Sequence, residues 1–124
     1  MKTSINLVSA SNVTGTDVRN PLGEDLGKIE DIMIDVNNGR IAYAVLSFGG
    51  FLGIGDKYFA IPWESLKHSM EEDDVYVLDV PKDKLENAPG FDRDNWPTRP
   101  DEEFVTNIYN YYGYKPYWDI TKPM

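Results

Sequence analysis

The sequence predicts an all-β fold, a small antiparallel β-barrel of about six strands with a short helical, aromatic-rich C-terminal extension. Three observations lead to it: short β-branched runs separated by turn formers, an Asn-Gly step between two such runs, and a change of composition after Gly90. The 124 residues, 41% of them hydrophobic, are enough for one domain core. We expect the barrel over residues 1–90, and an extension over residues 91–124 that packs on the barrel or on a second subunit.

A β-hairpin is the strongest local prediction. Two apolar runs, residues 28–36 and 40–48, flank Asn37-Asn38-Gly39. Asn-Gly tolerates the positive φ angles of a tight primed turn, whose twist matches that of the strands it joins. Both faces of the first run carry apolar and acidic side chains, so we expect this strand to lie in a barrel wall or at a dimer contact.

Shorter elements flank the hairpin. Turn formers at residues 20–27 should reverse the chain before the hairpin, and Pro89-Gly90 should end the barrel. Three further segments are predicted to be strands, because they show alternation of apolar and polar residues or a high content of β-branched residues. A fourth segment, a proline followed by charged residues, suits one or two helical turns. The three strands are Val13–Val18, Tyr58–Pro62 and Asp74–Val80, and the helical segment is Pro81–Ala88.

The C-terminal segment holds half of the chain's aromatic residues after position 95. Pro100 and the three acids that follow it suit the first turn of a helix, and Phe104 and Ile108 follow at helical spacing. We predict a short amphipathic helix from about Asp101 to Tyr112 that ends at Gly113. Its aromatic side chains could pack on their own barrel, pack on a second subunit or capture a partner.

The charge and the missing cysteines limit the classes of partner. A formal net charge of −9 disfavours nucleic acid and anionic membrane surfaces, because both require a basic surface. The absence of Cys removes disulfides, thiolate nucleophiles and zinc-thiolate sites. No segment approaches the roughly 20 apolar residues of a membrane-spanning helix, so we expect a soluble, cytoplasmic protein without membrane insertion.

No motif predicts a catalytic, metal or cofactor site. His68 is the only histidine and is expected to be solvated. The acids Glu71–Asp74 resemble a solvated loop more than a cation site, and Asp35–Gly39 fits a hairpin turn better than a calcium loop. The glycine-rich segment Gly49–Lys57 leads into a strand, which is not the context of a phosphate-binding loop. Trp63 after Pro62 is expected to cap the barrel core.

The candidate interaction surface combines the glycine-rich loop with the C-terminal aromatics. Apolar residues among glycines in that loop either form a contact surface or fold over one barrel mouth. The candidates are Phe51, Leu52, Ile54, Tyr109, Tyr112, Tyr117 and Trp118.

Three segments, residues 23–36, 39–49 and 58–66, together resemble the PRC-barrel family. The resemblance lies in the Gly-x-Ile-x-Asp strand that begins at Gly27, the hairpin after it and the Ile61-Pro62-Trp63 corner. It covers roughly residues 10 to 90. The family is similar to the cytoplasmic domain of the photosynthetic reaction-centre H subunit and to the C-terminal domain of a bacterial 16S rRNA-processing factor. The resemblance implies a barrel of about six strands that acts in assembly or protein binding, is often dimeric when it stands alone, and has no catalytic motif.

From these observations we expect a non-catalytic protein-interaction or assembly module that forms a homodimer and needs no cofactor. The alternative is a sensor domain that binds a small molecule or a metal ion at the barrel mouth or the acidic loop. An enzyme is disfavoured because no paired carboxylates, triad or metal-ligand cluster stands at a suitable spacing.

Overall fold

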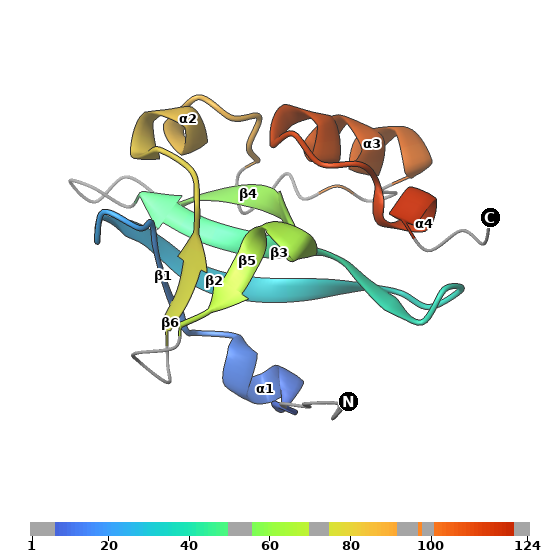
Figure 1. Cartoon of the computed structure of the whole chain (residues 1–124), viewed down its shortest axis with the longest axis horizontal. Coiled ribbons are helices and arrows are strands. Elements are labelled where there is room, and N and C mark those ends of the chain that lie inside the picture. The colour runs from blue at the N-terminus through green and yellow to red at the C-terminus, as the bar shows by residue number, and fades with distance from the viewer. Residues whose placement is uncertain (1–6, 50–55, 70–74, 92–96, 98–100, 121–124) are drawn as a thin grey trace, which may run out of the picture.

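The computed structural model describes residues 7–49, 56–69, 75–91, 97 and 101–120. Six strands form one curled sheet in the order β4-β3-β2-β1-β6-β5. The strands are β1 (Asp17–Arg19), β2 (Asp25–Asp35), β3 (Arg40–Gly49), β4 (Asp56–Pro62), β5 (Leu66–His68) and β6 (Val75–Leu78). The helical elements are α1 (Ala10–Val13), the 3₁₀ turn η2 (Trp63–Ser65), α2 (Lys82–Glu86), α3 (Glu102–Tyr111) and α4 (Tyr117–Ile120). Helices α2, α3 and α4 lie along one side of the sheet, and α1 lies on the other (Figure 1).

The sheet is mixed and open, which corrects the prediction of an antiparallel barrel in part. Neighbouring strands pair antiparallel except β1 and β6, which run parallel with Asp17 opposite Val75. Strands β4 and β5 stand at opposite ends of the order, so the described sheet curls only part of the way around its core. The chain is mostly β, as predicted, and its helical part is small.

The predicted hairpin is confirmed as β2 and β3, but its turn is longer than the tight primed turn that we expected. Asp35 pairs with Arg40, which leaves four residues in the loop. The N–H of Gly39, at φ 65°, donates to the Asp35 carbonyl at 2.8 Å. The Asp35 carboxylate accepts from the backbone N–H groups of Asn37 and Asn38 at 3.0 and 3.1 Å. One aspartate side chain therefore organises the loop, which a reading of Asn-Gly alone does not predict.

Two bulges explain why both faces of β2 carry apolar residues. The pairing of β2 with β3 passes over Glu30, so Ile29 and Ile32 both pack in the same core although they are three residues apart. At the second bulge, between Met33 and Ile34, the pairing passes over Ala42 on β3. A bulge places one extra residue on one strand and breaks the simple alternation of faces.

Most of the remaining predicted elements hold in type with shifted bounds, including the helical segment after Pro81, which is α2. The segment predicted as a strand from Val13 to Val18 divides into α1 and β1, whereas the other predicted strands correspond to β4 and β6. The helix predicted over 101–112 is α3: the Asp101 carboxylate caps it by accepting from the Phe104 N–H at 2.9 Å, and Gly113 follows its end at φ 80°. Strand β5 and helices α1 and α4 were not predicted.

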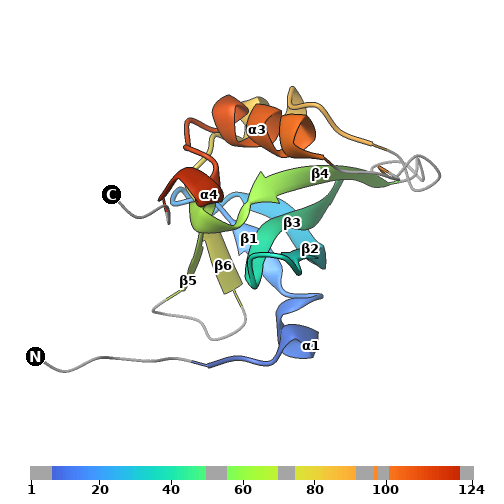
Figure 2. The same ribbon diagram turned by 90° about the vertical axis from the view of Figure 1, so that its right-hand side faces the viewer.

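Buried side chains form two clusters on the two faces of β3 and β4. The first fills the inside of the curl, with Leu46, Phe59 and Ile61 among its members. The second lies on the opposite face, where α3 and α4 cross the sheet (Figure 2), and it joins Tyr43, Val45, Tyr58 and Ala60 to Val105, Tyr109 and Tyr117. The aromatic extension thus covers a sheet face of its own chain.

Close contact between backbones fixes the inner part of the hairpin. A Cβ atom at Gly27, which has a φ of 101°, would lie 2.0 Å from the Ser47 carbonyl oxygen. Only glycine fits this position without moving β3. The glycine of the Gly-x-Ile-x-Asp segment therefore has a structural role.

Candidate interaction surface at the hairpin end

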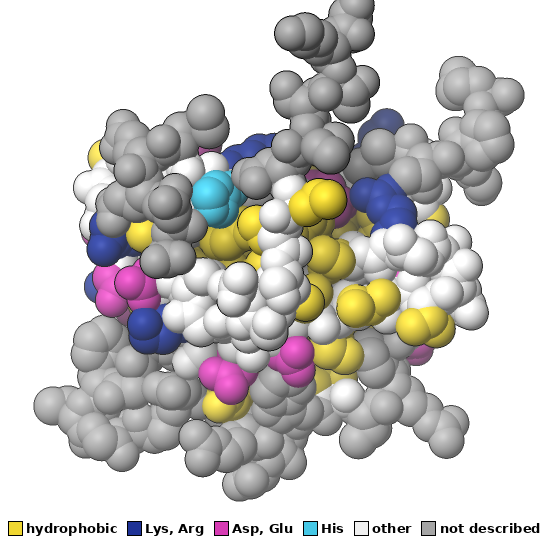
Figure 3. All heavy atoms as spheres, turned by 90° about the horizontal axis from the view of Figure 1, so that it is seen from below, with side chains coloured by type: hydrophobic (Ala, Val, Ile, Leu, Met, Phe, Trp, Pro, Cys, Tyr) yellow, Lys and Arg dark blue, Asp and Glu magenta, His cyan; other side chains and the backbone are white. Residues whose placement is uncertain are grey.

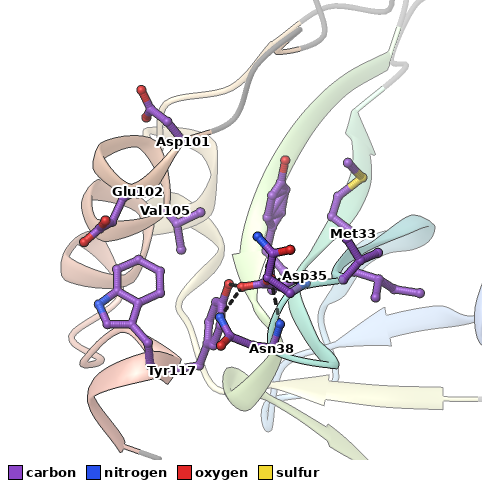
Figure 4. Close-up of a pocket in the computed structure, with 13 residues that line it drawn as sticks. Met33, Asp35, Asn38, Asp101, Glu102, Val105 and Tyr117 are labelled. Atoms are coloured by element: carbon purple, nitrogen blue, oxygen red, sulfur yellow. Dashed lines mark hydrogen bonds between the residues drawn. The ribbon is translucent and has the colours of Figure 1, made fainter. Parts of the chain in front are cut away.

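A groove of about 520 Å³ separates the end of the β2–β3 hairpin from the start of α3 and from α4. Figure 4 shows its two walls: Met33, Asp35 and Asn38 belong to the hairpin, and Val105 points toward them from α3. Asp101, which caps α3, and Glu102 complete the second wall, with their carboxylates on the side of the helix away from the hairpin. Tyr117 of α4 lies between the walls. The extension that covers the sheet face therefore also forms one side of the groove.

The hairpin wall exposes apolar side chains. Ile34 is 61% and Val36 is 83% exposed, although both are large β-branched residues near the end of a strand. Met33, beside them, is half-buried and packs against the second cluster. Seen from below, hydrophobic side chains form a broken band from the middle of the face toward the side where the hairpin ends (Figure 3). Scattered exposed apolar residues are ordinary, but two on one strand end beside a groove mark a candidate contact surface.

Tyr117 fixes α4 to the loop end of the hairpin through three contacts. Its hydroxyl donates to the Asp35 carboxylate, and its carbonyl accepts from Nη1 of Arg40 at 3.4 Å. The Arg40 guanidinium also lies over the Tyr117 ring, 5.5 Å from its centroid. The hydrogen bond from Tyr117, with those from the loop, lowers the pKa of Asp35, whereas burial and the bond to Asp35 raise the pKa of Tyr117.

Tyr109 fixes α3 to the sheet at the second bulge. Its fully buried hydroxyl donates to the carbonyl of Ala42 at 2.6 Å, and Oε1 of Glu64 lies farther away at 3.4 Å. Ala42 is the residue that the β2–β3 pairing passes over, so Tyr109 supplies a hydrogen bond to a carbonyl at an irregular point of the ladder. Burial, with the charge of Glu64, raises the pKa of Tyr109. Together, Tyr109 and Tyr117 hold the α3–α4 wall in place.

The structure corrects the sequence-based surface at three residues. Tyr109, Tyr112 and Tyr117 are 0%, 8% and 3% exposed, so they pack on their own chain and are not accessible on its surface. Trp118 is half-buried and lines the groove, with its ring centroid 5.0 Å from that of Tyr117. The three loop candidates, Phe51, Leu52 and Ile54, lie outside the described residues.

Sequence reasoning missed Ile34 and Val36 as surface residues. A signal for them is present in the sequence, because the first hairpin run has apolar residues on both faces, which predicts a barrel wall or a dimer contact. The bulges and the packing of α3 then decided which of those residues stayed exposed. Neither feature can be read from the alternation of residue types.

Two of the other single-residue candidates, His68 and Trp63, lie in the described part of the chain. His68, expected to be solvated, is half-buried with its ring 5.2 Å from that of Tyr76. Trp63 is half-buried and packs against the first cluster, near the role predicted for it. Among the described residues no group of three or more His, Asp or Glu could hold a metal ion, and Glu71–Asp74 lie outside them. No described helix has the length and apolar character needed to cross a bilayer.

Comparison with protein families identifies a related domain. The family model described as the PRC-barrel domain matches residues 5–85, which is more than half of the chain. The matched segment contains all six strands and stops before α3 and α4. A search of curated proteins found no match.

Proposed function

Because this chain belongs to the PRC-barrel domain family, we propose that it is a non-catalytic protein-interaction module whose contact surface is the groove at the hairpin end. The exposure of Ile34 and Val36 beside that groove carries the proposal. A partner that covered both side chains would remove apolar surface from water, which is the main favourable term in protein association. The fixed opposite wall favours the same function, because a rigid site loses little entropy on binding.

The groove offers little to catalysis. The Asp35 carboxylate is engaged by Tyr117 and the hairpin loop, and the Asp101 carboxylate caps α3. The described residues that line the groove include no histidine, serine or lysine that could serve as nucleophile or base. These features support a binding role.

Site-specific photo-crosslinking in intact cells tests the proposal. Benzoylphenylalanine at Val36 should give an adduct of reproducible mass, because that position lies in the contact surface. The matched control is benzoylphenylalanine at Leu22, which is equally exposed at 84% but lines a different part of the surface. An adduct at Val36 that is absent at Leu22 is expected, and identical adduct patterns at both positions would refute the assigned surface.

Self-association is the second candidate, favoured by the same two apolar residues. A homodimer through the hairpin ends would bury Ile34 and Val36 of both copies in one symmetric contact. Light scattering coupled to size exclusion over a range of concentrations measures the mass directly. A dimer that Ile34→Ser converts to a monomer would favour this candidate, and a monomer at all concentrations would exclude it.

A further inference from the structure

We infer that the partner of this groove is a segment of another protein that presents apolar side chains together with lysine or arginine. The inference rests on the proposed function and adds the chemistry of the partner. Three observations carry it: an apolar wall, an acidic wall opposite, and the absence of Lys and Arg from the described residues that line the groove.

The charge of the groove is concentrated at the start of α3. Asp101 and Glu102 line the groove, and Glu103 follows them in the same helical turn. The N-terminal end of a helix carries roughly half a positive charge, so three carboxylates leave this end clearly negative. At the hairpin wall, by contrast, the Asp35 carboxylate already accepts hydrogen bonds from Tyr117 and from the hairpin loop, and the Arg40 guanidinium lies over the Tyr117 ring. A cationic group at the outer edge of the α3 wall would therefore meet its strongest attraction beside Glu102.

The apolar side of the groove selects a side chain rather than a bare cation. Met33, Val36 and Trp118 line it together with the exposed Ile34. An indole ring also attracts ammonium and guanidinium groups, so Trp118 suits both parts of the expected partner. The volume of about 520 Å³ lies within the range of roughly 300–1,000 Å³ typical of sites for small ligands. The groove thus fits a few side chains of a segment, not a whole domain face.

A second copy of the chain fits this groove poorly. The net charge of −9 makes two copies repel each other. In a two-fold dimer the same patch contributes from both subunits, which would bring two acidic walls to one interface. Charge complementarity therefore favours a different, basic partner.

Titration of the intact protein with short capped peptides, followed by calorimetry and by amide chemical shifts, tests the inference. A peptide of alternating leucine and lysine should bind and should shift the amides of residues 33–38 and 101–105. A leucine–glutamate peptide should not bind, because its charge is repelled, and a serine–lysine peptide should bind more weakly, because it lacks apolar side chains. Binding should weaken as salt is added, since exposed charges are screened.

Two isosteric variants isolate the acidic wall. Glu102→Gln should weaken binding of the leucine–lysine peptide about 2- to 5-fold, the usual range for one exposed charge contact. Glu103→Gln removes the same charge from the neighbouring residue, which does not line the groove, and should change the affinity less. Both residues are exposed, so neither change should alter folding.

Each outcome bears on the inference separately from the proposed function. No saturable binding at about 1 mM peptide, where even a weak complex is half formed, or equal affinity for all three peptides, would overturn the inference. The proposed function would still stand if Val36 formed a specific adduct in cells. A Val36 adduct with twice the mass of the chain would overturn the inference as well, because the occupant would be a second copy.

Discussion

Replacing Tyr109 by phenylalanine should destabilise the protein, although the substitution removes a single oxygen atom. The hydroxyl of Tyr109 is fully buried and donates to the Ala42 carbonyl at 2.6 Å, while the Glu64 carboxylate lies at 3.4 Å. Its one proton serves the nearer acceptor. Phenylalanine would leave that carbonyl without its donor beneath α3, and an unsatisfied buried polar group costs about 1–3 kcal/mol.

Urea unfolding of the Tyr109→Phe variant measures this cost. With an m-value of about 2 kcal/mol/M, a loss of about 2 kcal/mol lowers the midpoint by about 1 M urea and leaves the slope unchanged. That loss is a large share of the roughly 5–15 kcal/mol by which a domain is stable.

Tyr111→Phe is the matched control. The hydroxyl of Tyr111 also projects from α3 and donates to a backbone carbonyl, that of Lys84, at 2.7 Å, but this bond is exposed. Water can replace it, so the cost should stay below about 0.5 kcal/mol. Equal losses in the two variants, or a loss under about 0.5 kcal/mol for Tyr109→Phe, would refute the argument that burial decides the effect.

Three further predictions follow from the same structure. Gly27→Ala should lower the free energy of unfolding by more than about 4 kcal/mol or prevent folding, because its Cβ would lie 2.0 Å from the Ser47 carbonyl oxygen. Gly23→Ala, at φ 84° in open space, is the control and should lower it by only about 1–2 kcal/mol, measured by thermal unfolding. Burial raises the pKa of Tyr43 to about 12, so its contribution to stability is complete below the unfolded pKa of about 10 and is lost as the pH rises toward 12; melting temperatures that do not fall across this range would contradict it. The pKa of Asp35 is lowered from 3.8, so its contribution is present above about pH 4 and is lost as the pH falls through the lowered value, and Asp35→Asn should flatten this part of the melting curve against pH.

Local sequence signals predicted the elements better than their connections. Asn-Gly between two apolar runs identified the hairpin, and proline followed by acids identified α3, because both signals act within a few residues. The parallel pairing of β1 with β6 and the short strand β5 depend on contacts between distant segments. Three residues of Leu66–His68 carry too little pattern to be recognised as a strand.

The sequence predicted an apolar contact surface but not the residues that form it. The aromatic residues of the extension indicated contact area, and Tyr109 and Tyr117 do make large contacts, but on their own sheet. Tyrosine packs equally well on its own chain and on a partner, so residue type cannot separate the two. The exposure of Ile34 and Val36 follows from the bulges in the hairpin and from the place where α3 packs, which only the assembled fold defines.

The parallel pairing of β1 and β6 has a consequence for the order in which the chain can fold as it is synthesised. Strands β2, β3 and β4 follow one another as antiparallel neighbours and can pair as soon as they emerge. One edge of β1, however, waits for β6, which is made much later. Contacts between distant segments slow folding, and an unpaired edge invites pairing with another chain. The nascent sheet therefore keeps one edge of β1 open to pairing until β6 has emerged.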